Sequence, residues 1–217
     1  MRTVTEGRVL GTLIEKELTT PDQYPLSANA LVLGCNQSTN REPVMRLEAA
    51  EIEDAVRTLK EERLARIVHP THGRGVTKYR HVVHETLGLE PDELAVLGVL
   101  LLRGPQTAGE IRTRAERLHT FDSVGEVDDA LARLAARPEP LAVHLERHPG
   151  QKEARWAQLL AAEVAPVDTG AAVRRDSPAG SSAPPEPGLR ERVEQLDARV
   201  RRLEEALGDL LGDLPDS

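Results

Sequence analysis

The chain has 217 residues with an ordinary apolar share of 39%, but only 2% of its side chains are aromatic. Its core must therefore be built from Leu, Val, Ile and Ala, which suits small helical units. The net charge of −8 and the single Cys35 exclude a strong nonspecific nucleic-acid binder, a disulfide framework and a Cys-based zinc cluster.

The excess of acidic side chains lies toward the C-terminus. Residues 1–85 hold 12 basic and 12 acidic side chains, residues 86–160 hold 9 and 12, and residues 161–217 hold 7 and 12. The sequence has no apolar run of membrane length, and its opening residues, MRTVTEGRVL, lack the apolar centre of a signal peptide. We therefore expect a soluble, cytoplasmic protein without a membrane partner.

The first part of the chain predicts three helices and a hairpin. RVLGTLIEKEL (8–18) is the first helix, and PLSANALVLGCN (25–36) is the second, with Ser27 as its expected N-cap. IEDAVRTL (52–59) repeats apolar residues at i, i+3, i+4 and i+7, which predicts a third helix with one buried stripe. LARIVHPTHGRGVTKYRHV (64–82) has two apolar runs around a polar tip, as in a β-hairpin.

A polar stretch, NQSTNREPV, connects the second and third of these helices. One interpretation is structural. Asn36 would cap the second helix, and Arg41 would pair with Glu42 or meet the first helix at Glu15, Lys16 or Glu17. The other is a contact to nucleic-acid phosphates, made by Gln37, Ser38, Thr39, Asn40 and Arg41. We favour the structural interpretation, because a local polar network accounts for every residue without a ligand.

The same plan then returns in the second part of the chain. AVLGVLLLRG (95–104), TAGEIRTRAERL (107–118) and VDDALARL (127–134) predict three helices, and LAVHLERHPGQKEARWAQL (141–159) predicts a hairpin. Capping boxes are expected at two helix starts, formed by Thr107 with Glu110 and by Ser123 with Glu126.

Three helices followed by a hairpin are the plan of a winged helix-turn-helix domain. The predicted fold is α+β and helix-rich, with two tandem winged helix-turn-helix domains at residues 1–86 and 87–160 and a C-terminal coiled-coil helix.

Residues 161–188 are rich in Pro, Gly, Ser and Ala, and we predict a flexible linker there. Residues 189–214 then resume a heptad pattern, which predicts a coiled-coil helix that forms a parallel homodimer. Its dimerisation residues would be Leu189, Val193, Leu196, Val200, Leu203, Leu207 and Leu210. Arg192 and Arg199 would face Asp197 and Glu204 of a partner chain. The alternative is a helix that packs on its own chain.

Two long segments carry a resemblance to a known family. EKELTTPDQYPLSANALVLGCNQSTNREPVM (15–45) and LLRGPQTAGEIRTRAERLHTFDSVGEV (101–127) closely resemble the signature segments of the YceH family, a bacterial group of uncharacterised function. The resemblance runs from about residue 5 to residue 160. It implies tandem winged-helix domains, which the internal repeat predicts independently, and it implies no activity or ligand. One departure is that RLEAAEIEDA lacks a Ser or Thr cap ahead of the third helix.

DNA binding is the leading functional hypothesis, by analogy of fold. The third helices argue against it, because carboxylates such as Glu53, Asp54, Asp128 and Asp129 would meet DNA phosphates. More favourable positions are basic residues on the first hairpin and on the second copy's short helix. These candidate nucleic-acid contacts are Arg74, Lys78, Arg80, Arg112, Arg114 and Arg117. The alternative is that these side chains only solvate a surface.

A metal site and an active site are not predicted. His69 with His72, and His81 with His84, lie three apart in predicted strands and so would point to opposite faces. Cys35 lies on an apolar helix and is read as a core residue. We therefore expect a non-enzymatic protein without cofactor, either DNA-binding or transcription-regulatory. The alternative is a protein–protein interaction module that uses the acidic third helices.

Overall fold

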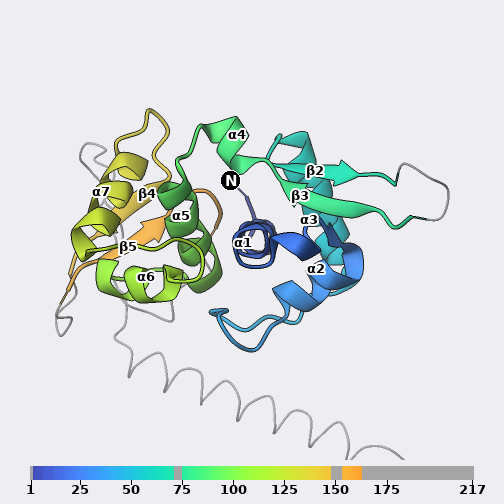
Figure 1. Ribbon diagram of the computed structural model, residues 1–217, viewed down its shortest axis with the longest axis horizontal. Coiled ribbons are helices and arrows are strands. Elements are labelled where there is room, and N and C mark those ends of the chain that lie inside the picture. Colours follow the sequence, from blue (N-terminus) through green and yellow to red (C-terminus); the bar gives the residue numbers. More distant parts are fainter. Residues whose placement is uncertain (1, 71–74, 148–152, 163–217) are drawn as a thin grey trace, which may run out of the picture. The chain divides into compact units, whose positions relative to one another are not determined.

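The computed structural model describes residues 2–70, 75–147 and 153–162. The first half of this part contains three helices and a small sheet (Figure 1). Its elements are α1 (Val4–Thr19), a 3-10 turn (Pro21–Gln23), β1 (Leu26–Ser27), α2 (Ala28–Cys35), α3 (Ala49–Glu61), β2 (Ala65–Val68) and β3 (Lys78–His81).

A short helix, α4 (Val83–Leu87), leads into the second half, where the order of three helices and a hairpin recurs. The elements there are α5 (Pro91–Arg103), α6 (Ala108–Ala115), α7 (Val124–Ala135), β4 (Ala142–Leu145) and β5 (Arg155–Gln158). The predicted helices and hairpins, and hence the mixed α+β class, are confirmed. The coiled coil predicted over 189–214, with its seven dimerisation residues, lies outside the described residues.

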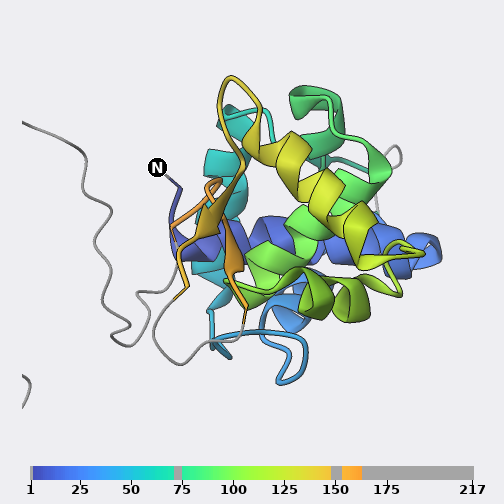
Figure 2. The same cartoon turned by 90° about the vertical axis from the view of Figure 1, so that its left-hand side faces the viewer.

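The third helices α3 and α7 have the buried stripes that the periodicity predicts. On α3 the buried residues are Ile52, Ala55, Val56 and Leu59. On α7 they are Val127, Ala130, Leu131 and Leu134. Figure 2 shows α7 in yellow beside the orange β4–β5 hairpin. Residues 52–59 and 127–134 therefore form equivalent helices, each with one face in the core.

The predicted caps are largely confirmed. The Ser27 hydroxyl accepts the Ala30 N–H at 3.3 Å, and Thr107 forms a reciprocal capping box with Glu110. Ser123 accepts the Glu126 N–H, but the Glu126 carboxylate accepts the N–H of Asp122 instead of closing a box. At α3 the N-cap position is occupied by Glu48, and the carboxylate of Glu51 accepts the Glu48 N–H at 2.8 Å. Each of these bonds satisfies a free N–H at a helix start.

Both hairpins are antiparallel. In each half, the residue just before the N-cap of the second helix also pairs with the second strand of the hairpin. In the first sheet, in the order β1–β3–β2, Leu26 pairs with Tyr79. In the second half, Gln106 pairs with Trp156 of β5 through two backbone hydrogen bonds. This shared pairing was not predicted, and it extends the internal repeat beyond its helices.

The first helices of the two halves, α1 and α5, pack on each other more extensively than any other pair of elements (Figure 1). Every residue from Glu6 to Glu15 in α1 and from Glu93 to Leu102 in α5 is buried. Gly11 permits the close approach, because a Cβ there would lie 3.0 Å from the Leu101 Cβ. The halves at 1–86 and 87–160 therefore share one continuous core.

The backbone just before α1 pairs with the residues that follow β5. The backbone of Arg2 pairs with that of Ala161, and the Ala162 N–H donates to the Arg2 carbonyl at 2.7 Å. Ala161 is buried, so the ordered unit extends past the residue where we placed the start of the linker. Within the described part of the chain, no helix has the length and apolarity needed to cross a membrane.

Candidate functional site

The polar connection between α2 and α3, residues 36–47, is closed by Asn36. The Asn36 side-chain amide donates to the Leu47 carbonyl at 2.8 Å, and its oxygen accepts the Leu47 N–H at 2.7 Å. Its own N–H donates to the Val32 carbonyl, which ends α2 as predicted. The Asn36 side chain thus joins the two ends of the connection rather than satisfying the last carbonyls of α2.

Those last carbonyls are taken by two arginines. Arg41 donates from Nε to the Gly34 carbonyl at 3.0 Å, and Arg8 of α1 donates to the carbonyls of Cys35, at 3.2 Å, and Pro43, at 2.6 Å. The connection is further tied to α5, because the Glu42 N–H donates to the Leu102 carbonyl at 2.8 Å. Charged side chains from α1 and from the connection itself therefore order this irregular segment.

Arg41 has an internal role. Its two Nη atoms donate to the two carboxylate oxygens of Glu15 at 3.1 and 2.6 Å, and its side chain is fully buried. Glu15 is one of the four residues that the sequence suggested, the others being Glu42, Lys16 and Glu17. Burial raises the pKa of Glu15, but the hydrogen bonds and charge of Arg41 outweigh it, so the pKa is lowered. As folded, Arg41 is not available to a phosphate.

The other polar residues of the connection meet α6 at a groove, which we call the loop–α6 groove. Its volume is about 430 Å³. It gathers residues that lie more than seventy positions apart in the sequence. The predicted candidates that line it are Gln37, Thr39, Asn40, Arg114 and Arg117, and Lys16 and Arg103 join them. Ser38 is exposed next to this set but does not line the groove.

The remaining candidates lie elsewhere. Lys78 and Arg80 are on β3, and Arg80 pairs with Glu85. Arg74 lies outside the described residues. Arg112 donates to the carbonyls of Phe121 and Asp122, both at 3.1 Å, and so holds the α6–α7 connection. The hairpin residues and the α6 residues are therefore not gathered into one site.

The outer faces of the third helices are acidic. Glu51, Glu53, Asp54 and Glu61 are exposed on α3, and Glu126, Asp128 and Asp129 are exposed on α7. Arg57 on the same face of α3 is neutralised by Asp54 at 2.8 Å. Arg133 of α7 pairs with Asp92 and Glu93 of α5. Either helix would present carboxylates to a DNA groove, as its sequence indicated.

The histidines correct one expectation. His81 and His84 do converge, because His81 ends β3 and His84 already lies in α4. Their ring centroids are 5.6 Å apart, and the His81 Nε2 lies 2.5 Å from the Glu17 carboxylate. Nδ1 of His81 accepts the Val83 N–H at 3.3 Å. A metal-binding imidazole normally donates its second N–H, whereas Nδ1 of His81 accepts one, so this arrangement does not suit a metal site.

Cys35 is fully buried, as expected of a core residue. Burial raises the pKa of its thiol to about 11. The thiol is 3.6 Å from the hydroxyl of Thr12. A protonated, enclosed thiol is a poor nucleophile, so Cys35 contributes to packing.

Comparisons with known proteins point to one family. The family model described as "Protein of unknown function, DUF480" matches residues 2–151. A UPF0502 protein of Geotalea daltonii is 46% identical over 200 residues, covering 92% of this chain and 85% of that protein. The UPF0502 protein of Shewanella piezotolerans is 44% identical over 209 residues, covering 94% and 92%. That of Geotalea uraniireducens is 52% identical over 158 residues, covering 73% and 71%.

Proposed function

We propose a function for this chain, which belongs to the bacterial family DUF480. The proposal is a non-enzymatic tandem winged-helix protein with a regulatory, nucleic-acid-associated role. Residues 15–45 and 101–127 resemble the signature segments of the YceH family, and this resemblance is in keeping with membership of DUF480. In this proposal the loop–α6 groove contacts nucleic-acid phosphates, the third helices do not enter the major groove, and the C-terminal helix forms a homodimer.

The winged-helix assignment is supported by the repeated order of elements and by the equivalence of α3 and α7. Each half ends in an antiparallel hairpin, which is the wing of such domains. The pairing of Leu26 with Tyr79 adds β1 as a short third strand to the first wing, and the single bridge of Gln106 with Trp156 lies at the corresponding place of the second.

The observation that carries the nucleic-acid proposal is the composition of the loop–α6 groove. Lys16, Arg103, Arg114 and Arg117 line it together with the neutral hydrogen-bonding side chains of the connection. Glu15 and Glu116 are its acidic members, and Glu15 is paired with Arg41 at 2.6 Å and with Lys16 at 3.5 Å. Arginine, lysine, threonine, asparagine and glutamine are common donors to phosphate oxygens. Such contacts give weak, sequence-independent binding, in keeping with the balanced charge of this part of the chain.

A titration of DNA binding against salt tests this proposal. Replacing Lys16 and Arg117 by Gln removes two phosphate contacts, and we expect the slope of log K against log salt to fall by roughly 0.9 for each contact. Arg57→Gln is the matched control, because it removes an exposed arginine from the acidic face of α3. Its slope should equal that of the unaltered protein. A flat slope for the unaltered protein, or an unchanged slope for the double variant, refutes the proposal.

A protein-interaction module is the second candidate, and the acidic face of α3 favours it. Exposed carboxylates that lack enough neighbouring cations suit a basic protein partner. Reversing charge with Glu53→Lys and Glu61→Lys should then abolish capture of that partner, and digestion of nucleic acid should leave capture intact. Capture that disappears on nuclease digestion would instead favour the nucleic-acid proposal.

A further inference from the structure

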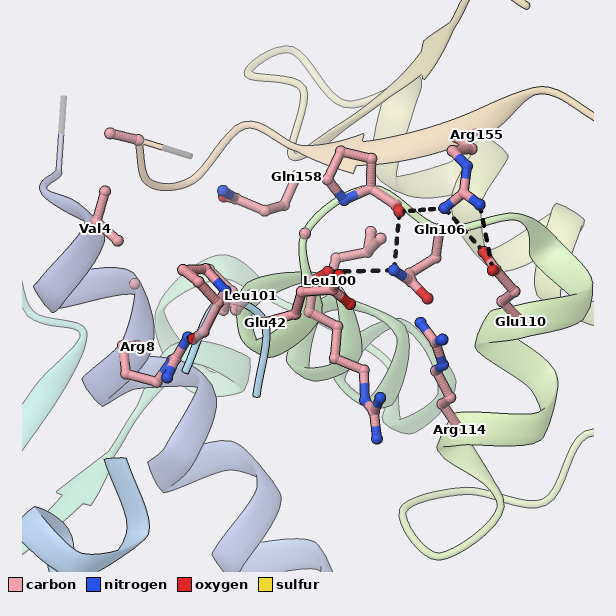
Figure 3. Close-up of a pocket in the computed structure, with 16 residues that line it drawn as sticks. Val4, Arg8, Glu42, Leu100, Leu101, Gln106, Glu110, Arg114, Arg155 and Gln158 are labelled. Carbon is pink, nitrogen blue, oxygen red and sulfur yellow. Dashed lines mark hydrogen bonds and ion pairs between the residues drawn. The ribbon is translucent and has the colours of Figure 1, made fainter. Parts of the chain in front are cut away.

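A second cavity lies where α1, the connection, α5, α6 and β5 meet, and we call it the arginine pocket (Figure 3). Its volume is about 430 Å³, within the range of small-molecule sites. Four arginines line it, Arg8, Arg103, Arg114 and Arg155. The carboxylates in its lining belong to Glu42 and Glu110. It shares Arg103 and Arg114 with the loop–α6 groove.

The positive charge in this pocket is only partly compensated. Arg155 pairs with Glu110 at 3.1 Å. Among the described residues, no carboxylate oxygen lies within 4.0 Å of a guanidinium nitrogen of Arg8, Arg103 or Arg114. Burial lowers the pKa of Arg103, and the neighbouring charge of Arg114 lowers it further. Like charges held together in a cavity are stabilised by an anion.

The pocket also contains buried polar atoms without a partner. In the described part of the chain, the side-chain oxygen of Gln106, Nη1 of Arg114 and Nε of Arg8 form no hydrogen bond. Gln106 is only 3% exposed. An unsatisfied buried donor or acceptor costs about 1–3 kcal/mol, so such groups commonly mark the place of a ligand or an ordered water.

The orientation of Gln106 is fixed by its surroundings. Its side-chain nitrogen donates to the carbonyls of Arg103, at 3.2 Å, and Pro105, at 2.8 Å. Its backbone is paired with Trp156. The amide oxygen must therefore face away from those carbonyls. Figure 3 shows the Gln106 oxygen and the Arg114 guanidinium pointing into the same part of the pocket, with Val4 and Arg8 at the other end.

We propose that the arginine pocket binds a small molecule that carries a phosphate group. The phosphate lies between Arg103 and Arg114, where two guanidinium groups donate to its oxygens. The Gln106 oxygen accepts a hydrogen bond from a hydroxyl of the ligand. The rest of the molecule extends along Leu101 and Val4. This ligand site goes beyond the proposed binding of nucleic acid in the neighbouring groove, and it would let a small molecule regulate that binding.

Inorganic phosphate is a direct probe, with sulfate as its matched control. Near neutral pH the phosphate dianion keeps one O–H that can donate to Gln106, whereas sulfate has none and would place an oxygen against an acceptor. By calorimetry at constant ionic strength, we expect phosphate to bind roughly tenfold or more tightly than sulfate. Ribose 5-phosphate, which offers both the phosphate and hydroxyl groups, should bind more tightly still, and ribose alone should not bind.

Two variants test the assigned contacts. Gln106→Leu should bring the ratio of phosphate to sulfate affinity close to one. Arg103→Gln should weaken phosphate roughly tenfold or more. Stability without ligand should change little, because removing one of two neighbouring like charges offsets the loss of the hydrogen bond from Arg103 to the Asn40 side chain. Arg117→Gln, which lines only the loop–α6 groove, should leave phosphate affinity unchanged while it weakens DNA. The two proposals can therefore fail separately.

Three outcomes would overturn the ligand site. One is equal binding of phosphate and sulfate that neither variant alters, which would mean an adventitious ion only. Another is the absence of measurable binding of phosphate and of ribose 5-phosphate by the unaltered protein. The third is displacement of phosphate by a short DNA duplex at the same DNA concentration at which that duplex binds the loop–α6 groove. This would make the pocket part of the nucleic-acid surface.

Discussion

Replacing Arg41 by Met is expected to lower the free energy of unfolding by about 3–5 kcal/mol. The change leaves the Glu15 carboxylate buried without its two hydrogen bonds from Arg41 and with only the Lys16 ammonium, 3.5 Å away, as a counter-charge, and a buried charge that loses its main partner is among the most costly defects in a protein. It also frees the carbonyl of Gly34, to which Arg41 donates. Chemical denaturation of the full chain measures the effect.

Two further variants show whether the loss of stability comes from breaking the ion pair or only from removing a side chain. Glu15→Leu combined with Arg41→Met removes both charges and should be much less destabilising than Arg41→Met alone. Arg57→Met breaks an exposed pair with Asp54 and should change stability by at most about 0.5 kcal/mol. If Arg41→Met were as mild as Arg57→Met, the connection would not depend on this ion pair.

The same pair predicts a dependence on pH. The pKa of Glu15 in the folded protein lies below its ordinary value of 4.5. The stabilisation is therefore fully present above that value and is lost as the pH falls through the lower, folded pKa. Glu15→Gln should show a smaller loss of stability than the unaltered protein between neutral and acidic pH.

Residues 1–86 produced alone are expected not to fold cooperatively. α1 is buried around its whole circumference, and part of that surface is covered by α5, which the shorter chain lacks. Residues 1–162 keep both helices and the pairing of Arg2 with Ala161, and should unfold in one transition. Circular dichroism during thermal unfolding distinguishes the two chains. An independent sigmoidal transition of residues 1–86 would show that the halves are separate folding units.

A single substitution at the contact between α1 and α5 tests the same dependence of one half of the protein on the other, with a smaller change. Ile14 is fully buried and faces Gly98 of α5, where an added Cβ would lie 2.9 Å from its Cγ2. Ile14→Ala should destabilise the whole unit by about 2–5 kcal/mol. Leu33→Ala, at a side chain that is 64% exposed, should have little effect.

The parts of the fold that could be predicted are those in which one stretch of sequence determines its own structure. Periodicity identified α3 and α7 because a stripe at i, i+3, i+4 and i+7 faces one core. Side-chain chemistry identified the caps at Ser27 and Thr107. Short elements such as β1 and α4 were missed, because two to five residues carry no period and depend on distant partners.

The shared core was missed for a related reason. A stripe shows that a helix is buried on one face but does not identify what covers it. The signals that were available are the nearly continuous apolar run of α5, typical of a helix buried on all sides, and the glycines Gly7 and Gly11. Only the structure shows that a Cβ at Gly11 would meet Leu101 of α5, and that a Cβ at Gly7 would meet Ala161 beyond β5.

The candidate site could be predicted only in part. The sequence left Arg41 between a local pair with Glu42 and residues of α1, and the structure shows the pair with Glu15 of α1. The sequence could not show that Gln37, Thr39 and Asn40 would meet Arg114 and Arg117, because that meeting depends on how α1 packs on α5. The arginine pocket was missed for the same reason. Its arginines come from three helices and a strand.

The connection between α2 and α3 has a consequence for how this chain can change over evolutionary time. Surface loops usually accept added or deleted residues at little cost. Here Asn36 fastens both ends, Arg8 holds Pro43 from one helix, and Leu102 holds Glu42 from another. A change of even one residue in length would break contacts with both helices at once. Although it has no regular secondary structure, this segment behaves as part of the scaffold.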